Sequence, residues 1–297
     1  MPDASVIVCT IDRPDHMREC AEAILANGYS SFEILVMDQS SDGRTRDVFE
    51  LLGDARLRYF RLDRPGKCLA MNTGIEHSHS EILCFTDDDC IVTPNWIENI
   101  VREFDADPQL NAIYGQTPPL FTTGSHIEFA TFVAPLRRVY LGRRSPYGVG
   151  GGGGNMAYRR SALAKVGPFD TNLGPGARFQ AVEDNEYFYR TFCHRIKAIY
   201  APSVIAYHKQ VWDRETWAKR HATYRFGDGA FIAKYLVAGD WHPLYYYLAL
   251  EAGRLSNALS NWQLPYAKFV AKSIWLTTKG ILSYTAWYRR EGKREPI

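Results

Sequence analysis

The fold is decided by the stretch Glu81-Ile82-Leu83-Cys84-Phe85-Thr86-Asp87-Asp88-Asp89-Cys90, in which a short apolar run ends in three consecutive carboxylates. An apolar run of this length is typical of a buried strand, so the acids fall at its carboxyl end. Open α/β sheets bind their ligands at that end. Adjacent like charges repel one another unless water or a cation neutralises them. The triplet is therefore either a solvated acidic turn or a site for a hard cation such as Mg²⁺ or Mn²⁺.

Length and composition indicate a folded protein. The 297 residues suffice for one large domain or for a domain with an appended piece, and 23% charged residues argue against disorder. A net charge of +2 does not suggest a nucleic-acid partner. The first residues lack the basic and apolar regions of a secretory signal, and we find no run of about 18 apolar residues that could span a membrane.

Six cysteines are scattered along the chain without any C-x-x-C pair, and several lie inside apolar runs. Thiols buried in a core explain this pattern better than a disulfide framework or a zinc site. We therefore expect a reducing, cytoplasmic environment, with the inner face of the plasma membrane as an additional location.

Strand and helix patterns alternate along the first half. We expect strands at 5–10, 32–37, 57–62, 82–85 and 111–115, and helices at 15–25, 45–52, from 67 onward and at 94–104. This order predicts a mostly parallel sheet with right-handed crossovers. No G-x-G-x-x-G follows the first strand, which argues against a dinucleotide-binding Rossmann domain. Further on, we expect a helix at 184–193 and strands at 197–200 and 202–208.

Two early positions are candidates for binding a nucleotide. Asp38 ends the second strand, where a carboxylate can accept hydrogen bonds from a base or ribose; the alternative is a carboxylate that caps a turn. Gly66 permits close backbone approach, and Lys67 offers a charge to a phosphate at the start of a helix, although an ordinary surface lysine fits the pattern as well.

Three later features are candidates for the chemistry. The glycine run 150–154 is either an anion nest or, as we prefer, an approach to a strand that borders the pocket, after a 140–149 loop that orders over the donor. Glu183 and Asp184 open a helix, where acids act as caps or, in a cleft, as a general base. His208 ends a strand and is either structural or a ligand.

Taken together, these segments resemble the family 2 glycosyltransferases, enzymes of the GT-A fold that move a sugar from a nucleotide diphosphate to an acceptor. The resemblance covers roughly residues 5–236. It is carried by Thr10 and Arg13, Asp38-Gln39-Ser40-Ser41-Asp42, Gly66-Lys67 with Asn72-Thr73-Gly74, Asp87-Asp88-Asp89 as a D-x-D motif, Gly153-Gly154-Asn155 with the residues that follow, Val166-Gly167-Pro168-Phe169-Asp170, Leu173-Gly174-Pro175-Gly176 and Glu183-Asp184-Asn185-Glu186.

The resemblance implies a GT-A-like α/β fold and a role for each matching residue. Asp184 is the expected base and Glu183 its neighbour in the catalytic pair. Metal ligands are expected at Asp89, Asp87 and His208, for Mg²⁺ or Mn²⁺. The nucleotide sugar is most commonly a uridine diphosphate sugar in this family, with thymidine and guanosine donors as alternatives. It is expected to contact Thr10, Arg13, Asp38, Gly66, Lys67, Asn72, Asp87 and Asp88. A single displacement would invert the anomeric configuration.

The spacing within the triplet adds a geometric expectation. In an extended strand Asp87 and Asp89 point the same way and Asp88 points to the other side. On that geometry, Asp88→Ala should be milder than Asp89→Ala.

We expect a catalytic domain at 1–236, with a nucleotide-sugar half at 1–115 and an acceptor half at 116–236, followed by a helical extension at 237–297. Residues 241–297 carry eight basic and three acidic side chains among Trp, Tyr and Leu, which fits a membrane-surface helix or a hairpin packed on the domain or on a second copy. A membrane-surface extension would suit a lipid-linked acceptor, while a glycan or a small molecule remains open. The Q-x-x-R-W signature of processive polysaccharide synthases is absent, which favours transfer of a single sugar over polymerisation.

Two other functions fit part of the pattern. A sugar-phosphate nucleotidyltransferase also binds a metal and a nucleotide, but the first strand is followed by Ile11-Asp12-Arg13-Pro14 and not by a glycine-rich basic loop. A non-catalytic sugar- or membrane-binding module on a degenerate scaffold would not need both acidic motifs.

Overall fold

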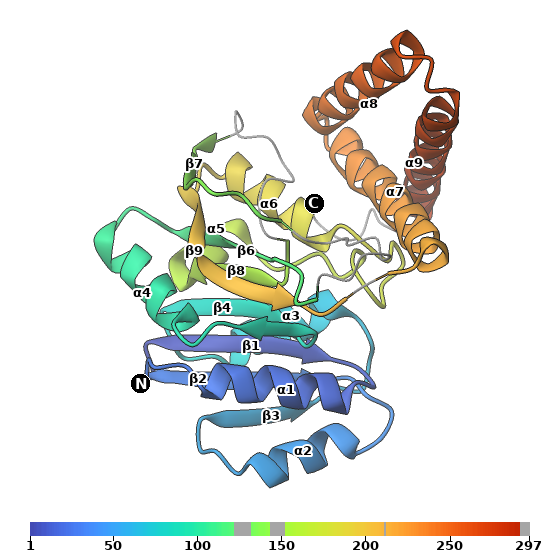
Figure 1. The fold of residues 1–297 in the computed structure, drawn as a ribbon. Helices are drawn as coiled ribbons and strands as arrows, with labels where there is room; N and C mark the ends of the chain where they lie inside the picture. Colours follow the sequence, from blue (N-terminus) through green and yellow to red (C-terminus); the bar gives the residue numbers. More distant parts are fainter. Residues whose placement is uncertain (122–131, 143–151, 211, 292–297) are drawn as a thin grey trace. The chain divides into compact units, whose positions relative to one another are not determined.

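The computed structural model describes residues 1–121, 132–142, 152–210 and 212–291 (Figure 1). Strands and helices alternate through the first half, as the sequence pattern predicts. The strands are β1 (Ala4–Thr10), β2 (Phe32–Asp38), β3 (Leu57–Arg61), β4 (Ile82–Asp87), β5 (Cys90–Val92), β6 (Ala112–Gln116), β7 (Arg138–Tyr140), β8 (Asn155–Arg159) and β9 (Ala198–His208). The helices are α1 (Pro14–Leu25), α2 (Arg44–Leu52), α3 (Lys67–His77), α4 (Trp96–Ala106), α5 (Arg160–Val166), α6 (Glu183–Cys193), α7 (Arg214–Val237), α8 (His242–Ser260) and α9 (Leu264–Arg290).

The described strands form one mixed sheet in the order β3-β2-β1-β4-β8-β6-β9-β5, with β7 paired to β9. Strands β3, β2, β1 and β4 run parallel to one another, because a helix connects each to the next along the chain. Strand β8 enters antiparallel between β4 and β6. The expectation of a mixed, mostly parallel sheet flanked by helices is therefore confirmed.

Helices cover both faces of this sheet (Figure 1). Alternate residues of β1 point to opposite faces: Val6 and Val8 pack with α1, α2 and α4, whereas Ile7 packs with α3, α5 and α6. Both sides of the strand are buried, which explains why its sequence is apolar without alternation.

Several boundaries differ from the expectation. Residues 197–200 and 202–208 are one strand, β9, because Pro202 lies where the register with β6 shifts and needs no ladder donor. Strand β5 was not predicted, since three residues carry too little pattern. The glycine run leads directly into β8, as expected for its described part, residues 152–154; residues 143–151 lie outside the described residues.

The chain divides into two compact units. One contains residues 1–171 and 183–214, with the whole sheet; the other contains residues 172–182 and 215–297. In the second unit Phe179 joins the 172–182 segment to the helices through ring contacts with Phe226, Tyr284 and Trp287. Helix α7 thus belongs structurally with α8 and α9, so the structural division falls near residue 214. The functional division at 236 stays a prediction.

Within the second unit, α7 and α9 cross with their backbones in contact. A Cβ built on Gly229 would lie 2.0 Å from the carbonyl oxygen of Thr277, and one on Gly280 would lie 2.0 Å from that of Phe226. Real Cβ atoms cannot approach so closely, so both glycines are required by this crossing.

We predict that Gly229→Ala destabilises the second unit by about 1–3 kcal/mol, because the helices must separate to admit the methyl group. Gly253→Ala is the matched control, since Gly253 lies in α8 and a Cβ added there would meet no atom within 4 Å. There the better helix propensity of alanine should stabilise by about 0.5–1 kcal/mol. Urea unfolding followed by circular dichroism measures both, and equal effects of the two changes would contradict the crossing.

Among the helices of the described ranges, none is both long enough and apolar enough to span a bilayer.

Candidate active site

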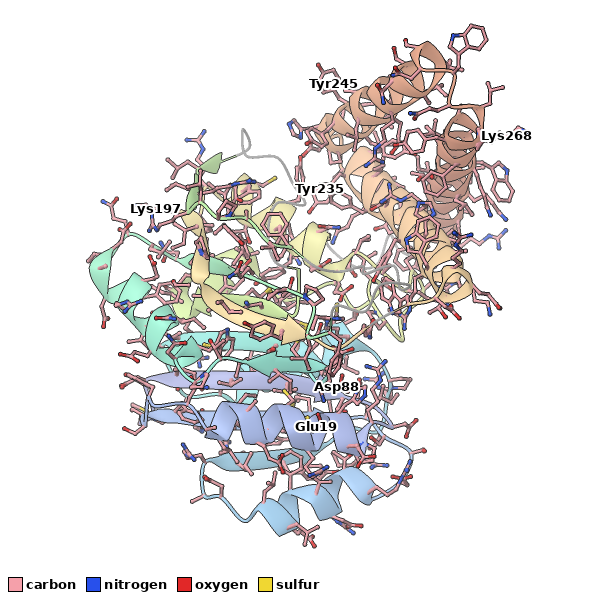
Figure 2. All side chains as sticks on the ribbon, viewed as in Figure 1. Glu19, Asp88, Lys197, Tyr235, Tyr245 and Lys268 are labelled. Carbon is pink, nitrogen blue, oxygen red and sulfur yellow. The ribbon has the colours of Figure 1, made fainter. Side chains whose placement is uncertain are left out.

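The carboxyl ends of three parallel strands bring candidate residues to one edge of the sheet. In the registers of β1 with β2 and β4, Thr10 is opposite Asp38 and Cys9 is opposite Asp87. Asp88 follows directly and lies at the same edge (Figure 2). The sheet therefore places the candidates from the first, second and fourth strands together, although they are far apart in the sequence.

The three aspartates do not point as an extended strand would direct them. Strand β4 ends at Asp87 and a turn follows, so the expectation that Asp87 and Asp89 share a direction is wrong. Instead Asp88 and Asp89 share Arg13, whose Nη1 lies 3.2 Å from Asp88 Oδ1 and 3.3 Å from Asp89 Oδ2. Thr10 donates to the other oxygen of Asp88 at 2.8 Å. Burial, reinforced by Asp89, raises the pKa of Asp88 to about 6.

Asp89, Cys90 and His208 form a candidate metal centre. One ligand atom from each lies within 4.8 Å of the others, and all three residues are buried. The pairing of β5 with β9 sets Cys90 opposite His208. Asp89 Oδ1 is buried without a hydrogen-bond partner among the described residues, 3.5 Å from His208 Nε2. An orphaned carboxylate oxygen beside an imidazole fits a divalent cation. Asp87 is not one of the three.

Gln210 forms hydrogen bonds with two of these three residues, Asp89 and His208. Its side-chain amide donates to Asp89 Oδ2, and its backbone N–H donates to His208 Nδ1 at 3.1 Å. Because Nδ1 accepts this hydrogen bond, the hydrogen of the imidazole is on Nε2, whose 3.5 Å contact with Asp89 Oδ1 is not a hydrogen bond. Ligation through Nε2 requires that hydrogen to leave and Gln210 to move away from Nδ1.

Lys67 links the acidic triplet to the second acidic pair. Its Nζ lies 2.6 Å from Asp87 Oδ1 and 3.4 Å from Glu183 Oε1. Burial favours the neutral acid at Asp87, but Lys67 outweighs burial and lowers the pKa of that carboxyl. At Glu183 burial prevails and raises the pKa to about 7. The ammonium thus neutralises Asp87 first, and Glu183 is poised to exchange a proton near neutral pH.

Asp184 lies against the glycine segment. Its Oδ2 accepts the backbone N–H of Gly153 at 2.9 Å, and its Oδ1 accepts that of Asn185 at 2.7 Å. A Cβ on Gly153 would lie 3.4 Å from Lys67 Nζ and 3.4 Å from Asp184 Cβ. A Cβ on Gly154 would lie 3.0 Å from Asp87 Oδ2. Because Gly153 and Gly154 have no side chains, Asp184 and Asp87 can both lie against this segment and so approach each other.

Two further predicted residues, Asp38 and Asn72, have partners within the protein, and a third, Gly66, has a backbone angle that favours glycine. Asp38 is fully buried and accepts hydrogen bonds from Ser40 and Tyr59, so it does form the turn cap that was the alternative. Asn72 exchanges two hydrogen bonds with the backbone of Phe169, at 2.8 and 2.9 Å. Gly66 adopts φ 139° immediately before α3. Their contacts with a nucleotide sugar stay predictions.

Cys90 and Gln210 were not singled out from the sequence. Cys90 reads as a core thiol, and burial indeed raises its pKa well above the usual value, so the thiol stays protonated. Gln210 carries no sequence signal, since its role depends on the pairing of β9 with β5.

The family follows from a comparison with known families. A family model described as "Glycosyl transferase family 2" matches residues 5–167, which is more than half of the chain. The chain belongs to this family. The matched region includes the acidic triplet and Gly153-Gly154, and it ends before Glu183-Asp184.

Two curated relatives come from Haloferax volcanii. The chain is 26% identical over 183 residues to a glucosyl-dolichyl phosphate glucuronosyltransferase, covering 57% of this chain and 56% of the relative. It is 31% identical over 183 residues to glycosyltransferase AglE, covering 59% of each. The chain therefore matches a little under three fifths of the length of these relatives.

Solved structures with the same fold include the mannosyltransferase PcManGT from Pyrobaculum calidifontis in complex with GDP-Man and Mn²⁺. Its TM-score is 0.59 at 20% identity, over 98% of this chain and 88% of that one. S. aureus TarS 1–349 in complex with UDP-GlcNAc gives 0.55 at 14% identity, over 80% and 72%. These likenesses confirm the expected GT-A-like fold.

Proposed function

We propose that the chain is a metal-dependent glycosyltransferase that moves a sugar from a nucleotide diphosphate to an acceptor hydroxyl. The observation that carries this proposal is the orphaned Oδ1 of Asp89 beside His208, at the same sheet edge as the Lys67, Asp87 and Glu183 network. Family membership and the ligands named for the neighbouring structures, GDP-Man with Mn²⁺ and UDP-GlcNAc, support it.

Asp89 and His208 would hold Mg²⁺ or Mn²⁺, with Cys90 beside them. A bound divalent ion would offset charge on the leaving diphosphate. Arg13 and Lys67, which contact the acids of the sheet edge, would pair with the diphosphate, and Thr10, Asp38, Gly66 and Asn72 complete the proposed donor site, with Asp87 and Asp88. The expected nucleotide is uridine diphosphate.

Asp184 is the proposed general base. Each of its oxygens accepts one backbone N–H and keeps a second lone pair for an acceptor hydroxyl. As Asp184 takes the hydroxyl proton, the acceptor oxygen bonds to the anomeric carbon, and the bond from that carbon to the diphosphate breaks with its electron pair. One displacement inverts the configuration. Glu183 orients Lys67 and the acceptor.

A titration with nucleotides tests the proposal. We expect UDP or another nucleoside diphosphate to raise the melting temperature in Mn²⁺, because a ligand at 100 times its Kd stabilises the folded state by about 2.7 kcal/mol. EDTA should remove this stabilisation and the transfer activity. The proposal is wrong if no nucleoside diphosphate shifts the melting temperature in Mn²⁺, or if EDTA changes neither binding nor transfer.

For location, we propose the cytoplasm, which the six free cysteines support. We also propose that the α8–α9 pair contacts a lipid surface. Apolar side chains are exposed along α8, and Trp241 and Trp262, which flank this helix, are 66% and 85% exposed. Figure 2 labels Tyr245 and Lys268 on these helices; both are exposed. Exposed aromatic and basic side chains together are typical of interfacial helices.

We predict that the protein cosediments with vesicles of phosphatidylcholine containing phosphatidylglycerol. Trp262→Ser should reduce the bound fraction severalfold, because it removes apolar area that the membrane interface would bury. Leu51→Ser is the matched control, since Leu51 is 87% exposed on α2. If Trp262→Ser instead abolishes a dimer seen by analytical ultracentrifugation and leaves vesicle binding intact, the face is a subunit interface.

A further inference from the structure

The candidate metal centre brings together three different donor atoms. Asp89 supplies a carboxylate oxygen, Cys90 a sulfur and His208 an imidazole nitrogen, and these atoms lie within 4.8 Å of one another. All three residues belong to the unit of residues 1–171 and 183–214. Mg²⁺ and Mn²⁺ prefer oxygen ligands, whereas a sulfur beside a nitrogen is typical of Zn²⁺ and other thiophilic ions. The sulfur of Cys90 therefore bears on which ion the centre binds.

The backbone holds these donors close together. Cys90 follows Asp89 directly, and the pairing of β5 with β9 sets Cys90 opposite His208. The backbone N–H of Lys209 donates to the carbonyl oxygen of Asp89 at 2.9 Å. Asp89 Oδ1 lies 3.5 Å from His208 Nε2, close to the separation of about 3.4 Å for two ligands at about 2.0–2.1 Å from one tetrahedral ion. This pair already has the spacing that a bound ion requires.

The sulfur of Cys90 lies at the acidic edge of the sheet. A Cβ built on Gly154 would lie 3.3 Å from Cys90 Sγ and 3.0 Å from Asp87 Oδ2. Cys90 is fully buried, and the neighbouring Asp89 is only 2% exposed. Oδ1 of Asp89 has no hydrogen-bond partner among the described residues. A buried carboxylate oxygen without a donor is stabilised by a cation, and the ion that binds it here would also meet the sulfur.

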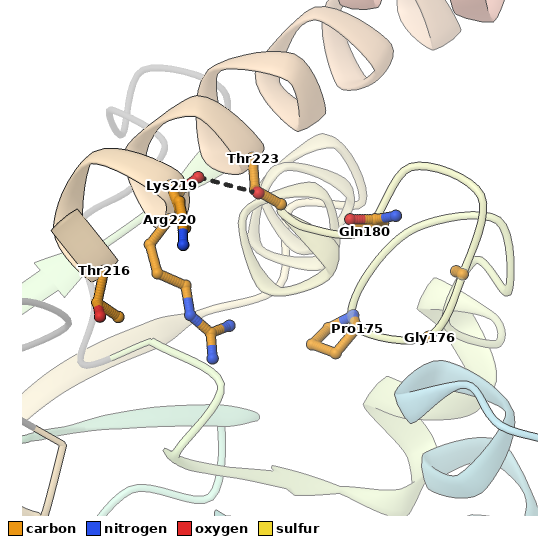
Figure 3. Close-up of a pocket in the computed structure, with 8 residues that line it drawn as sticks. Pro175, Gly176, Gln180, Thr216, Lys219, Arg220 and Thr223 are labelled. Carbon is orange, nitrogen blue, oxygen red and sulfur yellow. Dashed lines mark hydrogen bonds between the residues drawn. The ribbon is translucent and has the colours of Figure 1, made fainter. Parts of the chain in front are cut away.

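The pocket drawn in Figure 3 offers no competing position for such an ion. It lies in the second unit, and the described residues that line it include no histidine, cysteine or carboxylate. Two of its side chains, Lys219 and Arg220, are themselves cationic and would repel a divalent ion. Within the described ranges, the candidate metal centre is the one place where three such donors come together.

We infer that the candidate metal centre binds Zn²⁺ and other thiophilic divalent ions through the sulfur of Cys90. On binding, the S–H bond breaks, its proton goes to water, and the electron pair on sulfur forms the bond to the ion. The hydrogen on His208 Nε2 moves through water to Nδ1 as Gln210 leaves that nitrogen. The ion would occupy the position proposed for Mg²⁺ or Mn²⁺, so Zn²⁺ would regulate transfer by competition; this last step rests on the proposed transferase function.

Detection of the sulfur is the decisive measurement, because sites without a thiolate also bind Zn²⁺ more tightly than Mn²⁺. Co²⁺ bound to a thiolate has a sulfur-to-metal charge-transfer band in the near ultraviolet, which oxygen and nitrogen ligands alone do not produce. Titration of the full chain with Co²⁺ should give this band, saturating at one ion per chain, and equimolar Zn²⁺ should abolish it.

Cys90→Ser should remove the band and weaken Co²⁺ binding at least about tenfold, since a hydroxyl replaces the thiolate ligand. Mn²⁺ binding by the same variant, followed by electron paramagnetic resonance of the free ion, should change by less than about tenfold, because Mn²⁺ prefers oxygen ligands. Circular dichroism checks that the variant is folded. If serine destabilises the buried position, Cys90→Ala takes its place with the same expected result.

Cys20→Ser is the matched control. Cys20 lies on α1 and is also fully buried, and its sulfur donates to the carbonyl oxygen of Asp87 at 3.5 Å, a contact that a serine hydroxyl can keep. Because Cys20 is not one of the three donors, the charge-transfer band should persist in this variant.

Three results would overturn the inference: no band in the unaltered protein, equal loss of the band in the Cys20 and Cys90 variants, or Zn²⁺ that fails to displace Mn²⁺. Binding of UDP with Mn²⁺ is measured in parallel. If UDP binds and the band is absent, the sulfur assignment fails and the transferase proposal stands. If the band forms and no nucleoside diphosphate binds, the centre holds a thiophilic ion and the transferase proposal fails.

Discussion

Replacing Asp89 by asparagine should remove Mn²⁺ binding and lower kcat/KM by at least about 10²-fold, because the change takes away the charge of the only carboxylate in the candidate metal cluster of the described residues. In the variant, the amide nitrogen of asparagine can face His208. This nitrogen carries two hydrogens and cannot ligate a cation. Titration of Mn²⁺, followed by electron paramagnetic resonance of the free ion, measures binding without relying on turnover.

Asp88→Asn is the matched control for this change. Both oxygens of Asp88 already accept hydrogen bonds, from Thr10 and Arg13, whereas Oδ1 of Asp89 has no hydrogen-bond partner among the described residues. We expect Mn²⁺ affinity to change by less than tenfold and the melting temperature to fall modestly. Loss of Mn²⁺ binding of the same size in both variants would show that the triplet acts as a unit and that Asp89 has no special place in it.

Asp184→Asn should lower kcat by about 10²–10⁴-fold with little effect on donor affinity, since a general base acts mainly in the transition state. The side chain keeps its size and can still accept the Gly153 N–H, so the fold should persist. Single-turnover transfer, together with titration of the nucleotide, separates the chemical step from binding.

Glu183→Gln distinguishes the two acids of the pair. Burial raises the pKa of Glu183 to about 7, and a base must be deprotonated to act. If Glu183 were the base, kcat/KM would fall as the pH drops below about 7, and Glu183→Gln would abolish both activity and that limb of the profile. We expect a smaller loss than in Asp184→Asn, arising from the released Lys67.

Much of the first half of the fold is readable from the sequence. Strands β1 and β2 are β-branched, apolar and bounded by polar residues, which is what burial on both faces of a parallel sheet requires. Strand β5 escapes prediction because its three residues are defined only by pairing with β9, more than a hundred positions away. The 172–182 segment joins α7 and α9 through ring contacts of Phe179 that no local pattern encodes.

The sequence predicts which residues belong to the candidate site, but not which of them contact one another. Strand ends in a parallel sheet must meet at one edge, so Thr10, Asp38 and Asp87 are brought together by topology alone. The direction of each aspartate is not, because the strand ends at Asp87 and a turn redirects the next two side chains. The expected order of severity, Asp88 milder than Asp89, now rests on hydrogen-bond partners and not on strand alternation.

Arg13 and Lys67 have a consequence for handling the protein. Four acids at the sheet edge share two internal cations: Arg13 contacts Asp88 and Asp89, and Lys67 contacts Asp87 and Glu183. These two cations offset part of the repulsion among the acids, so we expect the fold to persist without a divalent ion. The protein should survive purification and storage in chelator, and dialysis against Mn²⁺ or Mg²⁺ should restore a working enzyme without a refolding step.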